Sequence, residues 1–210
     1  WAGRSSRIVI RDDGFGMSEE RLLDAMRPGS RSPVQDRDPA DLGRFGLGMK
    51  TASISQCRCL TVMTKAAGSD VAIRRWDLDY LSTVVTGEWR LLKGQGLLEA
   101  NDIKLLADTE SGTVLFWDRL DALVGDTDED DEFSQRHFRE RAEAVRDHLS
   151  MVFHRFLRGR GSVKLHLNGR LIEPWDPFLE ETSATEPLPS ESLGTGSEGF
   201  EVKAFILPHH

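Results

Sequence analysis

The stretch Ile10-Arg11-Asp12-Asp13-Gly14-Phe15-Gly16-Met17 decides how the chain is interpreted, because it joins a strand signal to a glycine-containing turn. The β-branched residues within Arg7–Arg11 predict a strand that ends at the Asp-Asp-Gly turn. An ionised aspartate only accepts hydrogen bonds. Asp12 at the end of such a strand therefore suits the exocyclic amine of adenine and repels the carbonyl oxygen of guanine.

The residues that follow Asp12 also fit a purine. Gly14 and Gly16 lack Cβ atoms where a flat base would lie against the backbone, and Met17 offers a polarizable wall for the ring. The same pattern is common in turns between a strand and a helix that bind nothing. Taken alone, it indicates a nucleotide site only weakly.

A second segment, Gly43-Arg44-Phe45-Gly46-Leu47-Gly48-Met49-Lys50, strengthens the nucleotide interpretation. Its three glycines crowd the start of a predicted helix, where freed backbone N–H groups and the helix dipole both favour a phosphate. Lys50 lies in the first turn, where the dipole disfavours a cation and a phosphate would offset that cost. The alternative is a glycine-softened helix start with a surface lysine. The two segments together favour a nucleotide site.

Residues Arg27–Leu42 separate the two segments and show no hydrophobic period. Loops longer than about 12–15 residues are usually functional or disordered. This loop has three prolines and few large apolar side chains, so we expect it to be mobile without ligand. Its serines and arginines, including Ser32, suit ribose and phosphate oxygens.

With these motifs in view, the chain resembles the GHKL ATPases, which include DNA gyrase B, the ninety-kilodalton heat-shock chaperone, sensor histidine kinases and MutL. The first segment is similar to the glycine box whose leading aspartate binds the adenine amine, a role that falls to Asp12. The second resembles the box that closes over the phosphates. Gly112-Thr113 resembles the Gly-Thr strand of the family, whose threonine shares a water with the adenine aspartate. Ser32 lies where MORC and chaperone-type members have a lid serine.

The resemblance implies a binding site for ATP with Mg²⁺. Its expected cofactor-binding residues are Asp12, Gly14, Gly16, Met17, Ser32, Gly43, Phe45, Gly46, Leu47, Gly48, Met49, Lys50 and Thr113. The family also has a helix before the first box that carries a Mg²⁺-binding asparagine and, in hydrolytic branches, a general-base glutamate. The sequence starts at Trp1 without that helix, so we interpret it as a piece of a longer protein and assign no catalytic or metal-binding residue.

The resemblance is strongest to the MutL, MORC and chaperone branch. It implies an ATP-driven switch in which lid closure couples to homodimerisation, Mg²⁺-dependent hydrolysis occurs in the intact protein, and DNA or a protein is the client. One alternative is a catalytic domain of the histidine-kinase type, which the further elements after the Gly-Thr strand disfavour. The other is a scaffold that senses ATP or ADP without turnover.

The composition of the chain limits which classes of function are compatible with the sequence. The 210 residues are 39% hydrophobic and 30% charged, as in an ordinary globular protein, and their net charge of −8 disfavours a broad nucleic-acid surface. No stretch approaches the ~20 apolar residues that span a bilayer, so we expect a cytoplasmic protein without membrane contact. Cys57 and Cys59 have no second ligand pair nearby and are interpreted as core residues. His137, His148 and His154 lack the i, i+4 spacing of a helical zinc site and are interpreted as ordinary helix residues.

The whole chain is predicted to be an α+β sandwich of the Bergerat type, with helices on one face of a mixed sheet. We expect an ATP-binding domain over residues 1–176, a linker over 177–198, and the first strand of a transducer-like domain over 199–210. The expected strands are Arg7–Arg11, Cys59–Lys65, Asp70–Asp77, Glu88–Lys93, Thr113–Trp117, Val163–Leu167 and Phe200–Leu207. The expected helices run from Ser18 to Met26, through Lys50–Ser53, and from Ser134 to Leu157. Asn168-Gly169 is expected to form a hairpin turn.

Overall fold

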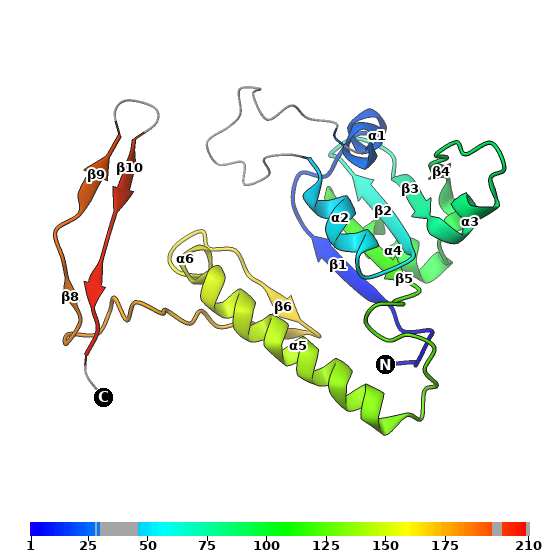
Figure 1. The fold of residues 1–210 in the computed structure, drawn as a ribbon. Helices are drawn as coiled ribbons and strands as arrows, with labels where there is room; N and C mark the ends of the chain where they lie inside the picture. Colours follow the sequence, from blue (N-terminus) through cyan, green and yellow to red (C-terminus); the bar gives the residue numbers. More distant parts are fainter. Residues whose placement is uncertain (28, 30–45, 195–198, 209–210) are drawn as a thin grey trace. The chain divides into compact units, whose positions relative to one another are not determined.

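The computed structural model describes residues 1–27, 29, 46–194 and 199–208, which form two compact units (Figure 1). The first unit is Trp1–Phe138 and the second is Arg139–His210. The loop expected over Arg27–Leu42 falls almost wholly outside the described residues. No helix in the described part of the chain is long and apolar enough to cross a membrane.

The first unit is built on a five-stranded sheet in the order β1-β5-β2-β3-β4. The expected strand at Cys59–Lys65 is confirmed residue for residue, whereas the one expected over Glu88–Lys93 is only two residues long. The strands are β1 (Ile8–Asp12), β2 (Cys59–Lys65), β3 (Ala72–Asp77), β4 (Leu92–Lys93) and β5 (Gly112–Asp118).

The α+β class is confirmed, but every pairing in this sheet is antiparallel and the expected mixed sheet is wrong. The sequence between β1 and β2 contains α1 (Glu19–Met26) and α2 (Gly48–Ile54), which is typical of a crossover between parallel strands. β1 and β2 do run in the same direction, because each is antiparallel to β5. They are not paired, since β5 arrives from much later in the chain and lies between them.

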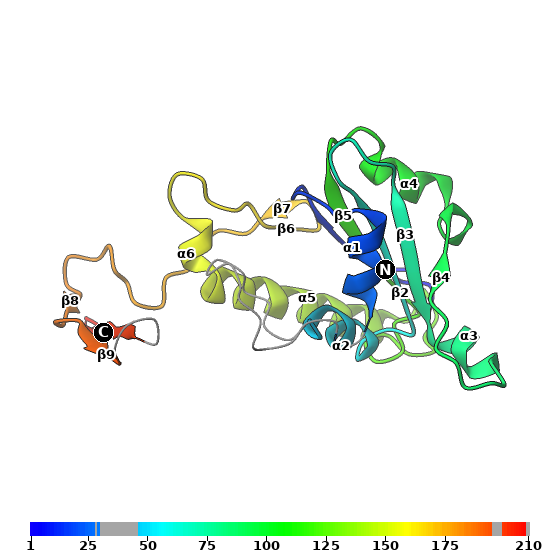
Figure 2. The same ribbon diagram turned by 90° about the horizontal axis from the view of Figure 1, so that it is seen from above.

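Helices cover both faces of the sheet, which corrects the expectation of helices on one face. Leu22 and Met26 of α1 pack with Leu60 and Val62 of β2 on one side. On the other side, α4 (Ala100–Ala107) buries Leu106 in a second cluster with residues of β2, β3 and β5. Figure 2 shows α2 and α4 on opposite sides of the strands. The sequence did not predict α4, which is short and whose N-cap residue, Glu99, makes no side-chain cap.

The start of α1 confirms the predicted cap and fixes this helix on the sheet. The Ser18 hydroxyl accepts a hydrogen bond from the Arg21 backbone N–H at 3.3 Å. Glu19, in the first turn, lies 2.6 Å from the buried guanidinium of Arg74 on β3 and 2.5 Å from Lys93 on β4. The Glu19 carboxylate therefore connects the start of α1 to both β3 and β4.

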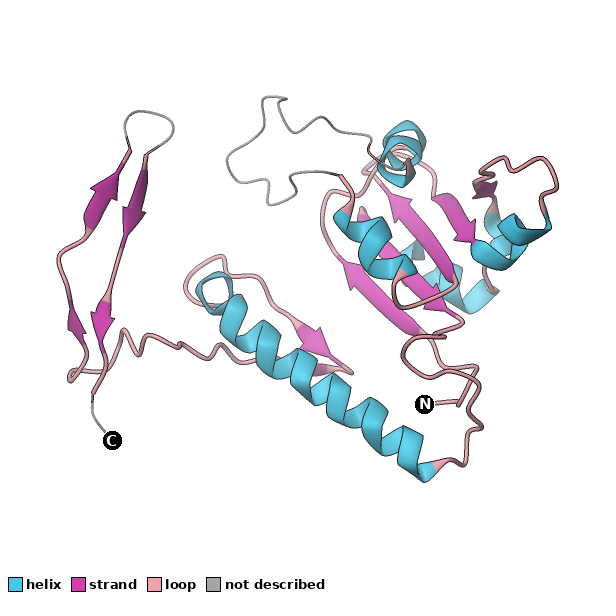
Figure 3. Ribbon diagram, in the orientation of Figure 1, coloured by secondary structure: helices cyan, strands magenta, loops and turns pink. Residues whose placement is uncertain are grey.

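The second unit is helical at first and ends in short strands (Figure 3). α5 (Glu132–Val152) enters it from the first unit and is separated from α6 (His154–Leu157) at Phe153, so the expected helix to Leu157 is interrupted. The Asn168-Gly169 turn is confirmed, with φ of 49° and 77°, between β6 (His166–Leu167) and β7 (Arg170–Leu171).

The segment expected to be a linker contains two strands, which pair with the chain end. β8 (Glu186–Pro187) pairs with β11 (Phe205–Ile206), and β9 (Glu191–Leu193) pairs with β10 (Phe200–Val202). These strands are two or three residues long and none of their residues is buried, so no hydrophobic alternation marks the first two in the sequence.

Candidate nucleotide-binding site

A row of three polar side chains crosses the sheet at the end of β1. Asp12 is directly opposite Thr113 of β5, and Thr113 is directly opposite Thr64 of β2. Directly opposed residues of antiparallel strands project from the same face of the sheet. The three side chains therefore share the face that α1 and α2 cover.

The Thr64 hydroxyl organises this row. It accepts a hydrogen bond from the Met17 backbone N–H at 2.9 Å and lies 3.0 Å from the Gly112 carbonyl, to which it must donate. A hydroxyl has one proton, so Thr113, 3.1 Å away, donates its own proton to Thr64. The lone pairs of Thr113 are thereby left to accept. Asp12 and Thr113 together present acceptors only, which suits a bound water or an amine that donates to both.

Asp12 is exposed and its carboxylate is oriented by the adjacent turn. The Gly14 backbone N–H donates to Asp12 Oδ1 at 3.0 Å, and no other described group bonds to this side chain. Gly14 belongs to the orienting turn itself, since a Cβ there would lie 2.9 Å from the same oxygen. Phe15, between the two glycines, is 95% exposed.

Gly16 is required by the fold as well as by any ligand. It has φ of +63°, and a Cβ at this position would lie 1.9 Å from the carbonyl oxygen of Lys65 at the end of β2. The sequence indicated that glycine leaves room for a base here, but the close neighbour is backbone. Met17 packs against the buried cluster beneath α1, so its side chain is part of the core as well as a candidate wall of the pocket.

The described part of the second glycine segment leads into α2. Gly46 has φ of +61°, Leu47 is the N-cap residue, and a Cβ on Gly48 would meet only open space. The backbone there is open to a ligand. Met49 packs against the same cluster as Met17. Ser32, Gly43 and Phe45 lie outside the described residues.

Lys50 is neither on the surface nor directed to solvent. It is 5% exposed, and its ammonium donates to the Ala25 carbonyl at 2.8 Å. Burial holds the pKa of Lys50 below its ordinary value. The ammonium is thus bound to the C-terminal end of α1 in this arrangement, a partner that no local sequence pattern indicates.

Thr64 is the member of the site that the sequence analysis missed. It follows Leu60 and Val62 on one face of β2 and is fully buried. The available signal is the hydroxyl of Thr64 at the end of a face of β2 that is otherwise apolar. This signal is not specific, because the other face of β2 is also buried and carries the hydroxyl of Thr61.

The cysteine pair is confirmed as part of the core. Cys57 and Cys59 are free and buried, and burial raises the pKa of the Cys57 thiol to about 11. A thiol with that pKa is almost wholly protonated at neutral pH, so it is a poor nucleophile.

Residues 2–113 match the family described as histidine kinase-, DNA gyrase B- and HSP90-like ATPases. The match covers more than half of the chain and runs from the N-terminal strand through both glycine segments to Thr113. The chain therefore belongs to this family of GHKL ATP-binding domains. No curated protein matches the sequence.

Proposed function

We propose that this domain binds ATP with its adenine amine against Asp12 and a water shared with Thr113. The observation that carries this proposal is the row across three strands, in which Thr113 donates its proton to Thr64 and keeps its lone pairs free to accept, directly opposite Asp12. Bound ATP would supply a phosphoanhydride and the charge that its Mg²⁺ neutralises. The family match supports the nucleotide, and the acceptors of the row support adenine, which presents an amine, over guanine, which presents a carbonyl oxygen.

The phosphates are assigned to the start of α2. The first backbone N–H groups of a helix have no partner within the helix, and those of Gly48 and Met49 adjoin the open space at Gly48. Gly43, Phe45, Gly46, Leu47 and Ser32 remain proposed contacts. Lys50 can reach a phosphate only by leaving the Ala25 carbonyl.

Calorimetric titration tests the base assignment. An ATP analogue should bind at least about tenfold more tightly than the matching GTP analogue, because a mismatched charged acceptor costs roughly 1.5–3 kcal/mol. Asp12→Asn should lose most of the binding while circular dichroism stays unchanged. Asp13→Asn is the matched control and should bind like the parent. Equal affinity for the ATP and GTP analogues would contradict the proposal that Asp12 recognises adenine.

We further propose that ATP orders the loop Arg27–Leu42 and that this closure drives dimerisation and, with Mg²⁺, hydrolysis in the intact protein. Support comes from the family membership and from the second glycine segment, which begins at Gly43 directly after this loop. DNA or a protein client is proposed on the same resemblance. Hydrogen exchange should show slower exchange over residues 29–42 with a non-hydrolysable ATP analogue than with ADP. Equal protection by the two nucleotides would argue against a switch.

A further inference from the structure

A buried histidine in the second unit lacks a partner for one of its ring nitrogens. His154 begins α6 and is 6% exposed. Its Nδ1 lies 2.6 Å from the Met151 carbonyl, which can only accept, so Nδ1 carries a proton. In a neutral imidazole this leaves a lone pair on Nε2. No described group makes a hydrogen bond to that nitrogen.

The unpartnered nitrogen faces a carboxylate that is held rigidly. Asp176 Oδ1 lies 3.6 Å from His154 Nε2 and accepts from the Phe178 backbone N–H at 2.9 Å. The other oxygen, Oδ2, accepts from the Glu180 N–H at 2.9 Å and from Arg158 at 3.1 Å. A carboxylate with three donors stays ionised. Two acceptors thus face each other in a buried position, and a cation between them would remove the conflict.

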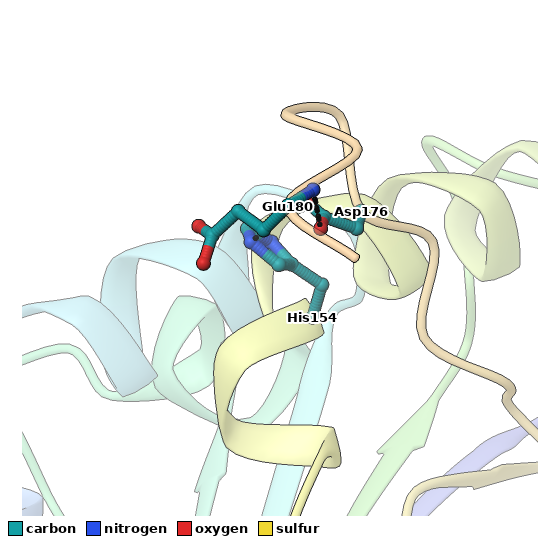
Figure 4. A group of neighbouring side chains, drawn as sticks. All are labelled: His154, Asp176 and Glu180. Carbon is teal, nitrogen blue, oxygen red and sulfur yellow. Dashed lines mark hydrogen bonds and ion pairs between the residues drawn. The ribbon is translucent and has the colours of Figure 1, made fainter. Parts of the chain in front are cut away.

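The distance between His154 Nε2 and Asp176 Oδ1 indicates which kind of cation fits between them. A hydrogen bond between N and O spans about 2.7–3.2 Å, so 3.6 Å is too long for a shared proton. An ion bonded to N and O at about 2.0–2.2 Å each bridges a gap of this size. Glu180 supplies a third oxygen, and the three candidate ligand atoms lie within 4.8 Å of one another (Figure 4).

We propose that His154, Asp176 and Glu180 bind one divalent transition-metal ion of the zinc class. One imidazole and two carboxylates suit Zn²⁺ and its neighbours, whereas Mg²⁺ and Ca²⁺ prefer sets of oxygen ligands. A water would complete four-coordination. All three residues belong to the second unit, so this site shares no residue with the candidate nucleotide-binding site.

The weak core of the second unit gives the ion a structural role. Among its described residues, only His154, Ile172 and Asp176 are buried. Small units with little apolar core are commonly held by a metal or a disulfide. Here the ion would join α6 to the turn at Asp176–Glu180. The ring centroids of Phe178 in that turn and Phe205 on β11 lie 5.4 Å apart. The same ion would therefore also stabilise the position of β11.

Arg155 competes with the ion for Glu180. Its guanidinium lies 2.7 Å from a Glu180 oxygen and 5.2 Å from the centre of the Phe178 ring. Glu180 is partly exposed and can turn toward His154 once this ion pair is broken. Arg158 contacts only the far oxygen of Asp176 and leaves Oδ1 free for the ion. Removal of the Arg155 charge should therefore tighten metal binding.

Metal titration of the 210-residue chain tests the site, with the terminal pair replaced (H209Q/H210Q) because adjacent histidines can bind these ions themselves. Zn²⁺ is titrated in competition with a chromogenic chelator, and Co²⁺ is followed by its visible absorption. We expect one ion per chain. His154→Gln should weaken binding at least about 100-fold, since even indirect supporting residues contribute about 10–100-fold. Glu180→Gln should weaken it at least about tenfold on the same scale, and Arg155→Gln should strengthen it.

His148→Gln is the matched control, because His148 is an exposed histidine on α5 in the same unit. Its affinity should equal that of the parent. The proposal is overturned if the parent binds no stoichiometric ion. It is also overturned if His154→Gln and His148→Gln bind alike. Arg155→Gln removes no ligand, so its tighter binding supports the site even if His154→Gln fails to fold, and weaker binding contradicts it.

Discussion

The ammonium of Lys50 donates a hydrogen bond to the backbone carbonyl of Ala25, 2.8 Å away, and so joins the first turn of α2 to the last turn of α1. Carbonyls in the last turn of a helix lack partners within the helix, and the helix dipole favours a cation there. The lysine that the sequence assigns to a phosphate therefore holds together the two helices that flank the Arg27–Leu42 loop.

Lys50→Met should destabilise the first unit. It leaves the Ala25 carbonyl without its donor, and hydrogen bonds to charged groups contribute about 1.5–3 kcal/mol. Urea unfolding measures the change. Lys104→Met is the control, because Lys104 is exposed on α4 and its ammonium donates to Asn101 in the same helix. If the two variants unfold alike, the Lys50–Ala25 bond is not a significant contact.

Thr64→Val and Thr113→Val should separate stability from binding. Thr64→Val removes the acceptor of the partly buried Met17 N–H and the hydroxyl that donates to the Gly112 carbonyl, and each buried group left unsatisfied costs about 1–3 kcal/mol. Thr113→Val removes the acceptor opposite Asp12 and leaves Thr64 its bonds to Met17 and Gly112. It should therefore weaken ATP binding about tenfold, equivalent to about 1.4 kcal/mol, with a smaller loss of stability. Urea unfolding and calorimetry on both variants check this, and the opposite pattern would contradict the assigned roles.

Gly16→Ala should unfold the domain or come close to it. A Cβ there would lie 1.9 Å from the Lys65 carbonyl oxygen, in addition to the cost of positive φ. Losses above about 4 kcal/mol are exceptional for one substitution, and steric overlap with strained backbone is among their causes. Gly68→Ala measures the cost of positive φ alone, because Gly68 has φ of +72° and no atom lies within 4 Å of the position of its Cβ. That variant should lose only about 1–2 kcal/mol. Thermal unfolding compares them, and equal losses would mean that the Gly16 turn can shift away from β2.

A low pH should weaken the ion pairs by which Glu19 holds the start of α1 against β3 and β4. Hydrogen bonds from Lys93 and Arg74 lower the pKa of Glu19 from 4.5 to about 2. A lowered folded-state pKa contributes stability above the unfolded value, and that contribution is lost as the pH falls from about 4.5 to about 2. Stability measured by urea unfolding across this range should fall more steeply for the parent than for Glu19→Gln. Parallel curves would show that this carboxylate makes no difference to folding.

Local sequence signals predicted the strand at Asp12, the capped helix after Ser18 and the start of α2. They failed where the fold depends on distant pairing. Nothing local shows that Gly112–Asp118 inserts between β1 and β2, which is why the sheet was expected to be mixed and why Thr64 was missed. The spacing of the helical histidines does not indicate a metal site at His154, because the carboxylates that it faces lie on a later turn.

The position of β5 also dictates when the site can exist during protein synthesis. β1 has no strand partner in the described sheet other than β5, so it cannot pair while the ribosome is still translating the codons before Gly112. A nascent chain that already contains both glycine segments would still lack the surface that reads adenine. Closing so long a loop is slow compared with forming a local hairpin. Nucleotide in the cell therefore cannot assist the early steps of folding, and a message truncated before that strand would encode both motifs without a binding site.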